Sequence, residues 1–92
     1  MGAMRINGIE LKPFTDKQRR VLIALGLAYP KSLNSPQLIG YVYPDPDLEP
    51  EYPESNIRNI VNNLRRKGRI PNWRVVSAIP GSQAGYRLER LS

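Results

Sequence analysis

The chain has 92 residues, no cysteine, no histidine and a formal net charge of +6. Its length allows one domain with a small core, and the two missing residue types exclude disulfides, thiol or imidazole catalysis and the usual zinc sites. No apolar run reaches the roughly 18 residues that a membrane-spanning helix needs, and no basic segment followed by an apolar one marks a signal peptide, so we expect a cytoplasmic protein.

The charges are distributed unevenly along the chain. Residues 45–54 carry five acidic side chains and no basic one, whereas residues 55–92 carry eight basic side chains and one acidic one. Basic charge clustered on a small domain is typical of a protein that binds a polyanion, although it also fits a surface that is merely basic and solvated. The residue types that accompany the charges are therefore needed to distinguish a polyanion-binding surface from a merely solvated one.

The N-terminal residues predict a small β-ribbon. Residues 1–3 are typical of a remnant of cloning, so we place the single domain at residues 4–92. The run RINGIEL, residues 5–11, sets an Asn-Gly pair between two isoleucines, which favours a hairpin with a two-residue turn.

Two helices are expected next. Thr15, followed three residues later by Gln18, is the pattern of a capping box, and Pro30 ends this first helix. In the second helix we expect Ser35 as the N-cap and Pro36 at the first helical position. The apolar positions expected to face the core are Val21, Leu22, Leu25, Ala28, Leu38, Ile39 and Val42.

Residues 44–54, PDPDLEPEYPE, form an acidic segment rich in proline. Prolines at this density disfavour both helix and sheet, so we expect an extended, stiff loop. The favoured interpretation is a solvated spacer that repels DNA and thereby helps to orient the domain. The alternative is a surface that contacts another protein.

The run SNIRNIVNNLRRKGRI, residues 55–70, predicts a third helix over residues 56–67. Ser55 or Asn56 is the expected N-cap, and Gly68 is expected to end the helix. Apolar side chains recur along one helical face and are expected in the core. They are Ile57, Ile60, Val61 and Leu64.

The opposite face of this helix carries asparagines and arginines. Asparagine is a poor helix former, so its repeated use sacrifices helix propensity for side chains that both donate and accept hydrogen bonds. An amide matches the N6 and N7 edge of adenine, as arginine matches the O6 and N7 edge of guanine. Basic residues near a helix C-terminus also stabilise it through the dipole, but this explains Lys67 and not the asparagines.

The C-terminal residues predict a β-hairpin over residues 73–91. Apolar and polar side chains alternate in WRVVSAI, residues 73–79, and in YRLERL, residues 86–91, with PGSQAG between them. We expect Trp73 in the core. Three helices followed by an antiparallel hairpin indicate an α+β fold, a winged helix-turn-helix with an N-terminal ribbon.

The runs INGIEL, VLIAL, SPQLIGYVY, SNIRNIVNNLRRKGRI and GYRL together resemble the DNA-binding effector domain of OmpR-type response regulators. The resemblance covers most of residues 5–91. It implies contacts to a DNA groove from the outer face of residues 56–66 and a position for Arg87 near the minor groove. It also implies that the loop 44–54 contacts RNA polymerase.

We therefore expect sequence-specific binding of double-stranded DNA and a role in transcriptional regulation, with helix 56–67 in the major groove and the hairpin 73–91 as the wing. The expected base contacts are Asn59, Asn62, Asn63 and Arg66. The expected backbone or wing contacts are Arg58, Arg65, Lys67, Arg69, Arg74 and Arg87. The alternative is a winged helix that binds protein through the third helix or through the loop 44–54.

Catalysis is not expected from this sequence. It has no histidine or cysteine and no glycine-rich phosphate loop, and its acidic residues cluster on a proline-rich loop. We expect no cofactor, no metal and no membrane partner. No apolar helix is left over for a subunit interface, so we expect a monomer or a weak dimer.

Overall fold

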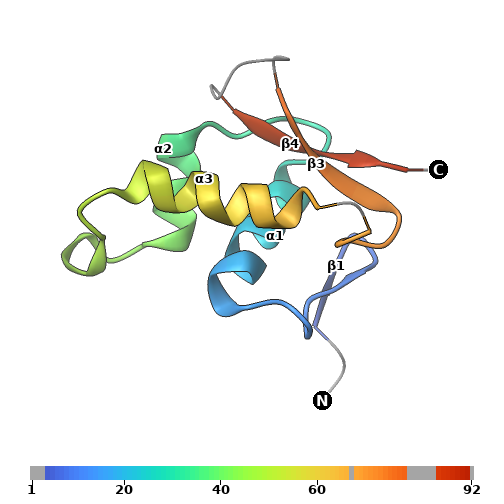
Figure 1. Cartoon of the computed structure of the whole chain (residues 1–92), viewed down its shortest axis with the longest axis horizontal. Helices are drawn as coiled ribbons and strands as arrows, with labels where there is room; N and C mark the ends of the chain where they lie inside the picture. Colours follow the sequence, from blue (N-terminus) through green and yellow to red (C-terminus); the bar gives the residue numbers. More distant parts are fainter. Residues whose placement is uncertain (1–3, 67, 79–84, 92) are drawn as a thin grey trace.

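The computed structural model describes residues 4–66, 68–78 and 85–91, which form three helices and two small antiparallel sheets (Figure 1). In chain order the elements are β1 (Arg5–Ile6), β2 (Ile9–Glu10), α1 (Asp16–Ala28), α2 (Ser35–Val42), the 3-10 turn η1 (Pro46–Leu48), α3 (Pro53–Leu64), β3 (Trp73–Ser77) and β4 (Tyr86–Arg90). The expected α+β class is confirmed.

The N-terminal ribbon is the predicted hairpin. Ile6 pairs with Ile9, and the two turn residues Asn7 and Gly8 have φ angles of 50° and 82°, the left-handed conformation that an Asn-Gly turn favours. The Asn7 amide donates a hydrogen bond of 2.9 Å to the carbonyl of Gly26. The ribbon is therefore fastened to the C-terminal half of α1, where a Cβ at position 26 would overlap Ile6.

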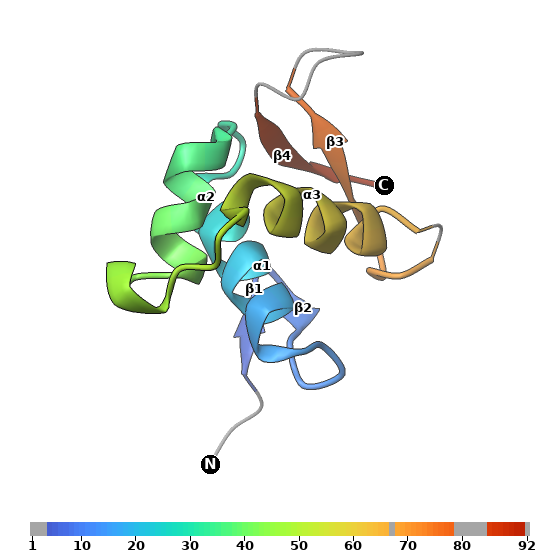
Figure 2. The same cartoon turned by 60° about the vertical axis from the view of Figure 1, so that its left-hand side comes forward.

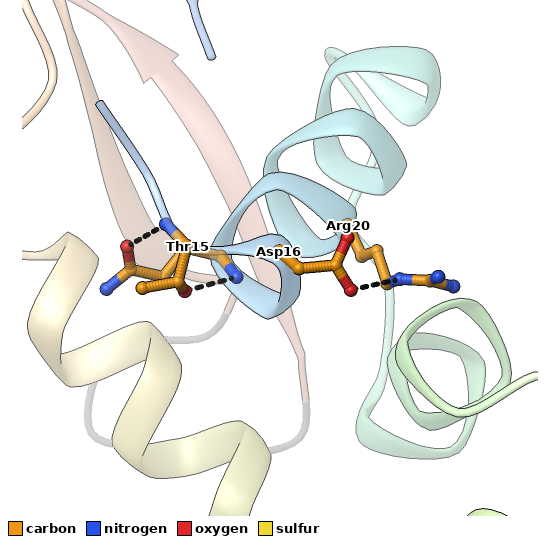
Figure 3. Close-up of polar contacts among 4 residues, drawn as sticks. Thr15, Asp16 and Arg20 are labelled. Atoms are coloured by element: carbon orange, nitrogen blue, oxygen red, sulfur yellow. Dashed lines mark hydrogen bonds and ion pairs between the residues drawn. The ribbon is translucent and has the colours of Figure 1, made fainter. Parts of the chain in front are cut away.

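Helix α1 begins with the predicted capping box. The Thr15 hydroxyl accepts a hydrogen bond of 3.2 Å from the backbone N–H of Gln18, and the Gln18 side chain accepts one of 3.0 Å from the backbone N–H of Thr15. Figure 3 shows this cap and, beside it, an ion pair of 3.0 Å between Asp16 and Arg20. The chain leaves the helix at Ala28, before Pro30 as expected.

The N-cap of α2 is Asn34, which corrects the prediction of Ser35. The Asn34 side chain accepts a hydrogen bond of 2.9 Å from the N–H of Gln37, and the Gln37 side chain accepts one of 2.9 Å in return. Asn34 has glutamine three residues later and can complete a capping box, whereas Ser35 is followed at that distance by Leu38. Ser35 is therefore the first helical residue and Pro36 the second.

The acidic loop is less extended than predicted, since residues 46–48 form η1. The Asp45 carboxylate accepts a hydrogen bond of 3.0 Å from the N–H of Asp47, which closes this turn. Pro46 occupies its first position, where a missing N–H costs nothing.

Both predicted ends of α3 are corrected. The helix begins at Pro53, with Tyr52 at the N-cap position and no side-chain cap, because a proline at the first position already fixes the helical φ. It ends at Leu64, so Arg65 and Arg66 follow the helix, although their high helix propensity extends the prediction to residue 67. The chain must turn there to bring Ile70 into the core, and Gly68, with φ of 75°, lies in that turn.

The core lies between α3, α1 and the hairpin β3–β4. The buried stripe of α3 is Ile57, Val61 and Leu64, with Ile60 half-buried, as predicted. From the hairpin, Val75 and Leu88 are paired and face the core, and Trp73 is buried as expected, with Tyr29 packed edge-on at 4.9 Å between ring centroids. Figure 1 shows α3 lying across α1.

One further backbone contact joins the hairpin to the helices. Leu33, between α1 and α2, forms an isolated antiparallel bridge with Tyr86 of β4, with hydrogen bonds of 2.8 and 2.9 Å. A Cβ at Gly85 would lie 3.1 Å from the Leu33 carbonyl, so glycine permits this close approach. The predicted strand residue Ile79 and the hairpin tip 80–84 lie outside the described residues.

Candidate nucleic-acid interface

The outward side of α3 is open to solvent. The helix lies on α1 with α2 beside it (Figures 1 and 2), it also contacts β3, and its apolar stripe is buried. The exposed side chains that we call the open face are Arg58, Asn59, Asn62 and Arg66. Arg58, Asn59 and Asn62 share one side of α3, as the sequence predicts, and Arg66 is exposed just beyond the end of the helix.

The open face combines charge with amide groups. None of the hydrogen bonds or ion pairs among the described residues uses a side chain of these four residues. One guanidinium group and two amides on α3, together with a second guanidinium just after the helix, are therefore presented to solvent. Such a set can donate to phosphates and can both donate to and accept from base edges.

Asn63 is not part of the open face. It is half-buried, and its Oδ1 accepts hydrogen bonds of 3.0 Å from Nε2 of Gln18 and 3.4 Å from Nε of Arg69. The structure thus separates Asn63 from Asn59 and Asn62, with which the sequence grouped it.

Two of the predicted backbone contacts are engaged within the protein. The Arg65 guanidinium donates to the Ser77 hydroxyl and lies 5.5 Å from the ring centroid of Tyr86, so it joins the end of α3 to the hairpin. The Arg69 guanidinium lies 4.5 Å from the ring centroid of Phe14 and is half-buried. Lys67, a third predicted contact, lies outside the described residues.

The hairpin presents its two predicted arginines on one side. Arg74 pairs with Glu89, and Val76 pairs with Arg87, so all four side chains project from the face opposite the core. An ion pair of 2.8 Å links Arg74 to Glu89, and this hydrogen bond holds the pKa of the Glu89 carboxyl below its ordinary value. Arg74 is thereby partly neutralised, whereas Arg87 has no such pair among the described residues.

Gln18 has a second role that the sequence did not predict. Its backbone and side chain were expected to cap α1, and the structure confirms this, but the same side chain also donates to Asn63, 45 residues away. Nothing in a local pattern indicates a contact over that separation. The one available signal in the sequence was that this polar residue stands at a helical position beside the apolar stripe of α1, next to the core.

A separate open pocket lies between α2 and the start of α3. It has a volume of about 550 Å³. Its lining residues are Pro36, Ile39, Glu49, Glu51, Tyr52, Pro53, Glu54 and Ser55. The neighbouring side chains of Tyr52 and Leu48 are 69% and 76% exposed, so the acidic loop offers apolar surface as well as charge.

None of the helices within residues 4–66, 68–78 and 85–91 combines the length and the apolar character needed to cross a membrane. No protein-family model matches the chain, and neither does any curated protein or any solved structure.

Proposed function

We propose that this protein is a winged helix-turn-helix that binds double-stranded DNA with sequence preference and regulates transcription. In this proposal α3 lies in the major groove and the hairpin β3–β4 is the wing. The observation that carries it is the open face of α3, in which exposed arginines and asparagines stand where a purely structural helix would carry glutamate and lysine.

The architecture supports this assignment of roles. An α-helix with its side chains is about 10–12 Å wide, and the major groove of B-DNA is about 12 Å wide. The bridge between Leu33 and Tyr86 adds a short third strand position beside the hairpin, in the order expected for a winged helix. The open face and the outer side of the hairpin carry more arginine than acid, as a polyanion requires.

The side chains divide into two kinds of contact. Asn59 and Asn62 are separated by about 4.5 Å along the helix axis, close to the rise of about 3.4 Å between stacked bases, so they suit neighbouring base pairs. We assign them to adenines and Arg66 to a guanine. Arg58 and Arg87 are assigned to phosphates.

A titration with a 20-base-pair duplex of random sequence tests the proposal. We expect weak binding whose affinity falls steeply with salt, because phosphate contacts release condensed counterions. Arg58→Ala should reduce the affinity and the salt dependence. Lys12→Ala, which removes one exposed charge from the loop before α1, is the matched control and should change both much less. Binding that is absent at low salt would refute the proposal.

The pocket beside α2 favours a second candidate function, the binding of a protein. Its rim carries three glutamates together with the exposed ring of Tyr52, a combination that suits a cationic segment with an apolar anchor. The resemblance to response regulators names RNA polymerase as the partner. Tyr52→Ser should weaken binding to the purified polymerase and leave duplex affinity unchanged. If polymerase binding were also unchanged, the loop would be only a solvated spacer.

A further inference from the structure

A polar cluster joins the start of α1 to the end of α3. We define it as the node: Gln18, Asn63 and Arg69. Gln18 donates 3.0 Å to Oδ1 of Asn63, and Arg69 donates 3.4 Å to that same oxygen and 3.4 Å to Oε1 of Gln18. Gln18 is 8% exposed, so its amide group depends on hydrogen-bond partners within the protein.

The node is itself held in place from both sides. Oε1 of Gln18 also accepts the hydrogen bond from the Thr15 N–H that closes the cap of α1, which fixes this side chain to the helix terminus. The Arg69 guanidinium lies over the Phe14 ring, a buried core residue. The oxygen of Asn63 therefore meets two donors whose own positions are restrained.

Within the range that the apolar stripe of α3 allows, these hydrogen bonds restrain the rotation of the helix about its axis. Apolar contacts are non-directional and tolerate small rotations, whereas hydrogen bonds require alignment. Adjacent helical residues differ by 100° around the axis, so a rotation that turned Asn63 outward would turn Asn62 toward a flank. The buried stripe of Ile57, Val61 and Leu64 already turns Asn62 outward, and the node restrains the angle at which it faces solvent.

We infer that Asn63 is a positioning residue: through Gln18 and Arg69 it sets the rotation at which Asn59 and Asn62 meet base edges, and it makes no DNA contact itself. The inference rests on the proposed function and deepens it, because it places sequence preference under the control of a contact on the buried side of α3.

The test exchanges each of two neighbouring asparagines for aspartate, a change of equal charge. At Asn63 both hydrogen bonds are accepted by Oδ1, so a carboxylate can keep them and gains attraction from Arg69. At Asn62 a carboxylate loses the donor and repels the duplex. Asn63→Asp should change the affinity for a duplex selected from a random pool by less than about threefold, whereas Asn62→Asp should cost roughly 10- to 100-fold.

A second pair of variants removes the node. Asn63→Leu and Gln18→Met abolish the hydrogen bonds, and both should lower the melting temperature. At temperatures where each variant is fully folded, the ratio of affinities for selected and random duplex should fall, while the salt dependence stays the same. An unchanged ratio would mean that the node contributes only stability, which would overturn the inference.

The same experiments separate this inference from the proposed function. If Asn63→Asp lost as much affinity as Asn62→Asp while the wild type bound duplex, Asn63 would be a DNA contact and the inference would be wrong. If the wild type bound neither duplex, the proposed function would fail and the role in DNA reading with it. The melting temperatures of Asn63→Asp and Asn63→Leu would then still decide whether the node holds α3.

Discussion

Arg65 and Arg66 are neighbours in the chain, but their side chains have different surroundings. We therefore expect them to have different roles. Arg65 is engaged with Ser77 and Tyr86 of the hairpin, whereas the Arg66 side chain is exposed beside Asn62. A basic run in this sequence thus contains one arginine engaged within the protein and one exposed arginine that we propose binds DNA, and only the fold distinguishes them.

Arg66→Ala should cost about 1–3 kcal/mol of binding free energy on the preferred duplex and relax the preference at one base pair. The free energy of unfolding should stay nearly constant, because no contact within the described residues is lost. Arg65→Ala should instead lower the unfolding free energy by about 1–2 kcal/mol, through the loss of a hydrogen bond and a cation–π contact. Urea denaturation and duplex titration of both variants check this; equal losses of sequence preference would contradict it.

The pair of Arg74 and Glu89 predicts a pH dependence. The pKa of Glu89 is lowered in the folded protein by the hydrogen bond from Arg74, so its contribution to stability is present above the unfolded pKa and is lost as the pH falls through the folded one. Glu89→Gln should therefore be less stable than the wild type at neutral pH and equally stable in strong acid. Melting temperatures at pH 7 and near pH 2 compare them. The variant should also bind duplex more tightly, since Arg74 is released.

At the scale of elements, two glycines in helices have opposite roles. A Cβ at Gly26 in α1 would overlap Ile6 of the ribbon, whereas a Cβ at Gly40 in α2 would meet nothing within 4 Å. Gly26→Ala should destabilise by about 1–3 kcal/mol through overpacking, and Gly40→Ala should stabilise by about 0.5–1 kcal/mol through helix propensity. Chemical denaturation measures both. A stabilising Gly26→Ala would mean that the ribbon does not pack on α1 as described.

Local chemistry made much of this architecture predictable. The Asn-Gly turn, the capping box at Thr15 and the apolar stripe of α3 are all encoded within a few residues, and each was found as predicted. The boundaries of α3 were not, because Arg65 and Arg66 favour helix until the burial of Ile70 forces the chain to turn. Tertiary packing overrides propensity at such ends.

The residues of the open face likewise divide into those that local spacing predicts and one that depends on tertiary contacts. Helical spacing places Arg58, Asn59 and Asn62 together from the sequence alone, since 100° per residue determines which side chains share a side. It could not place Asn63, which lies at the border between the exposed and buried sides. Its position is decided by Gln18, which is distant in the sequence.

At the scale of the molecule, the acidic loop 44–54 lies apart from the basic hairpin. The domain measures 37 × 36 × 20 Å, and Figure 1 shows the acidic loop that contains η1 at one end of the longest axis, away from the hairpin. In the proposed complex, this loop opposes the approach of a duplex to its own side and leaves the open face and the outer side of the hairpin as the favourable side. We therefore expect the charge distribution to orient the proposed encounter with DNA as well as to strengthen it.

The double variant Glu49→Gln/Glu51→Gln tests this orientation. Both residues are exposed, so the fold should be unaffected. At about 10 mM salt the variant should associate with random duplex about threefold faster, and the difference should vanish near 0.5 M salt, where charges are screened within a few ångströms. Stopped-flow association measures the rates. A difference that persisted at high salt would indicate a direct contact in place of a long-range field.

The two backbone hydrogen bonds between Leu33 and Tyr86 attach the outer edge of β4 to the connection between α1 and α2. Within the described residues they join this strand to the α1–α2 connection by backbone, and they add a directional restraint to a hairpin whose inner side is held by the burial of Val75 and Leu88. If both hydrogen bonds are stably formed, these two amide protons should exchange with deuterium more slowly than those at the free edge of β3. In the proposed complex, a duplex that displaced the hairpin would have to break these two hydrogen bonds.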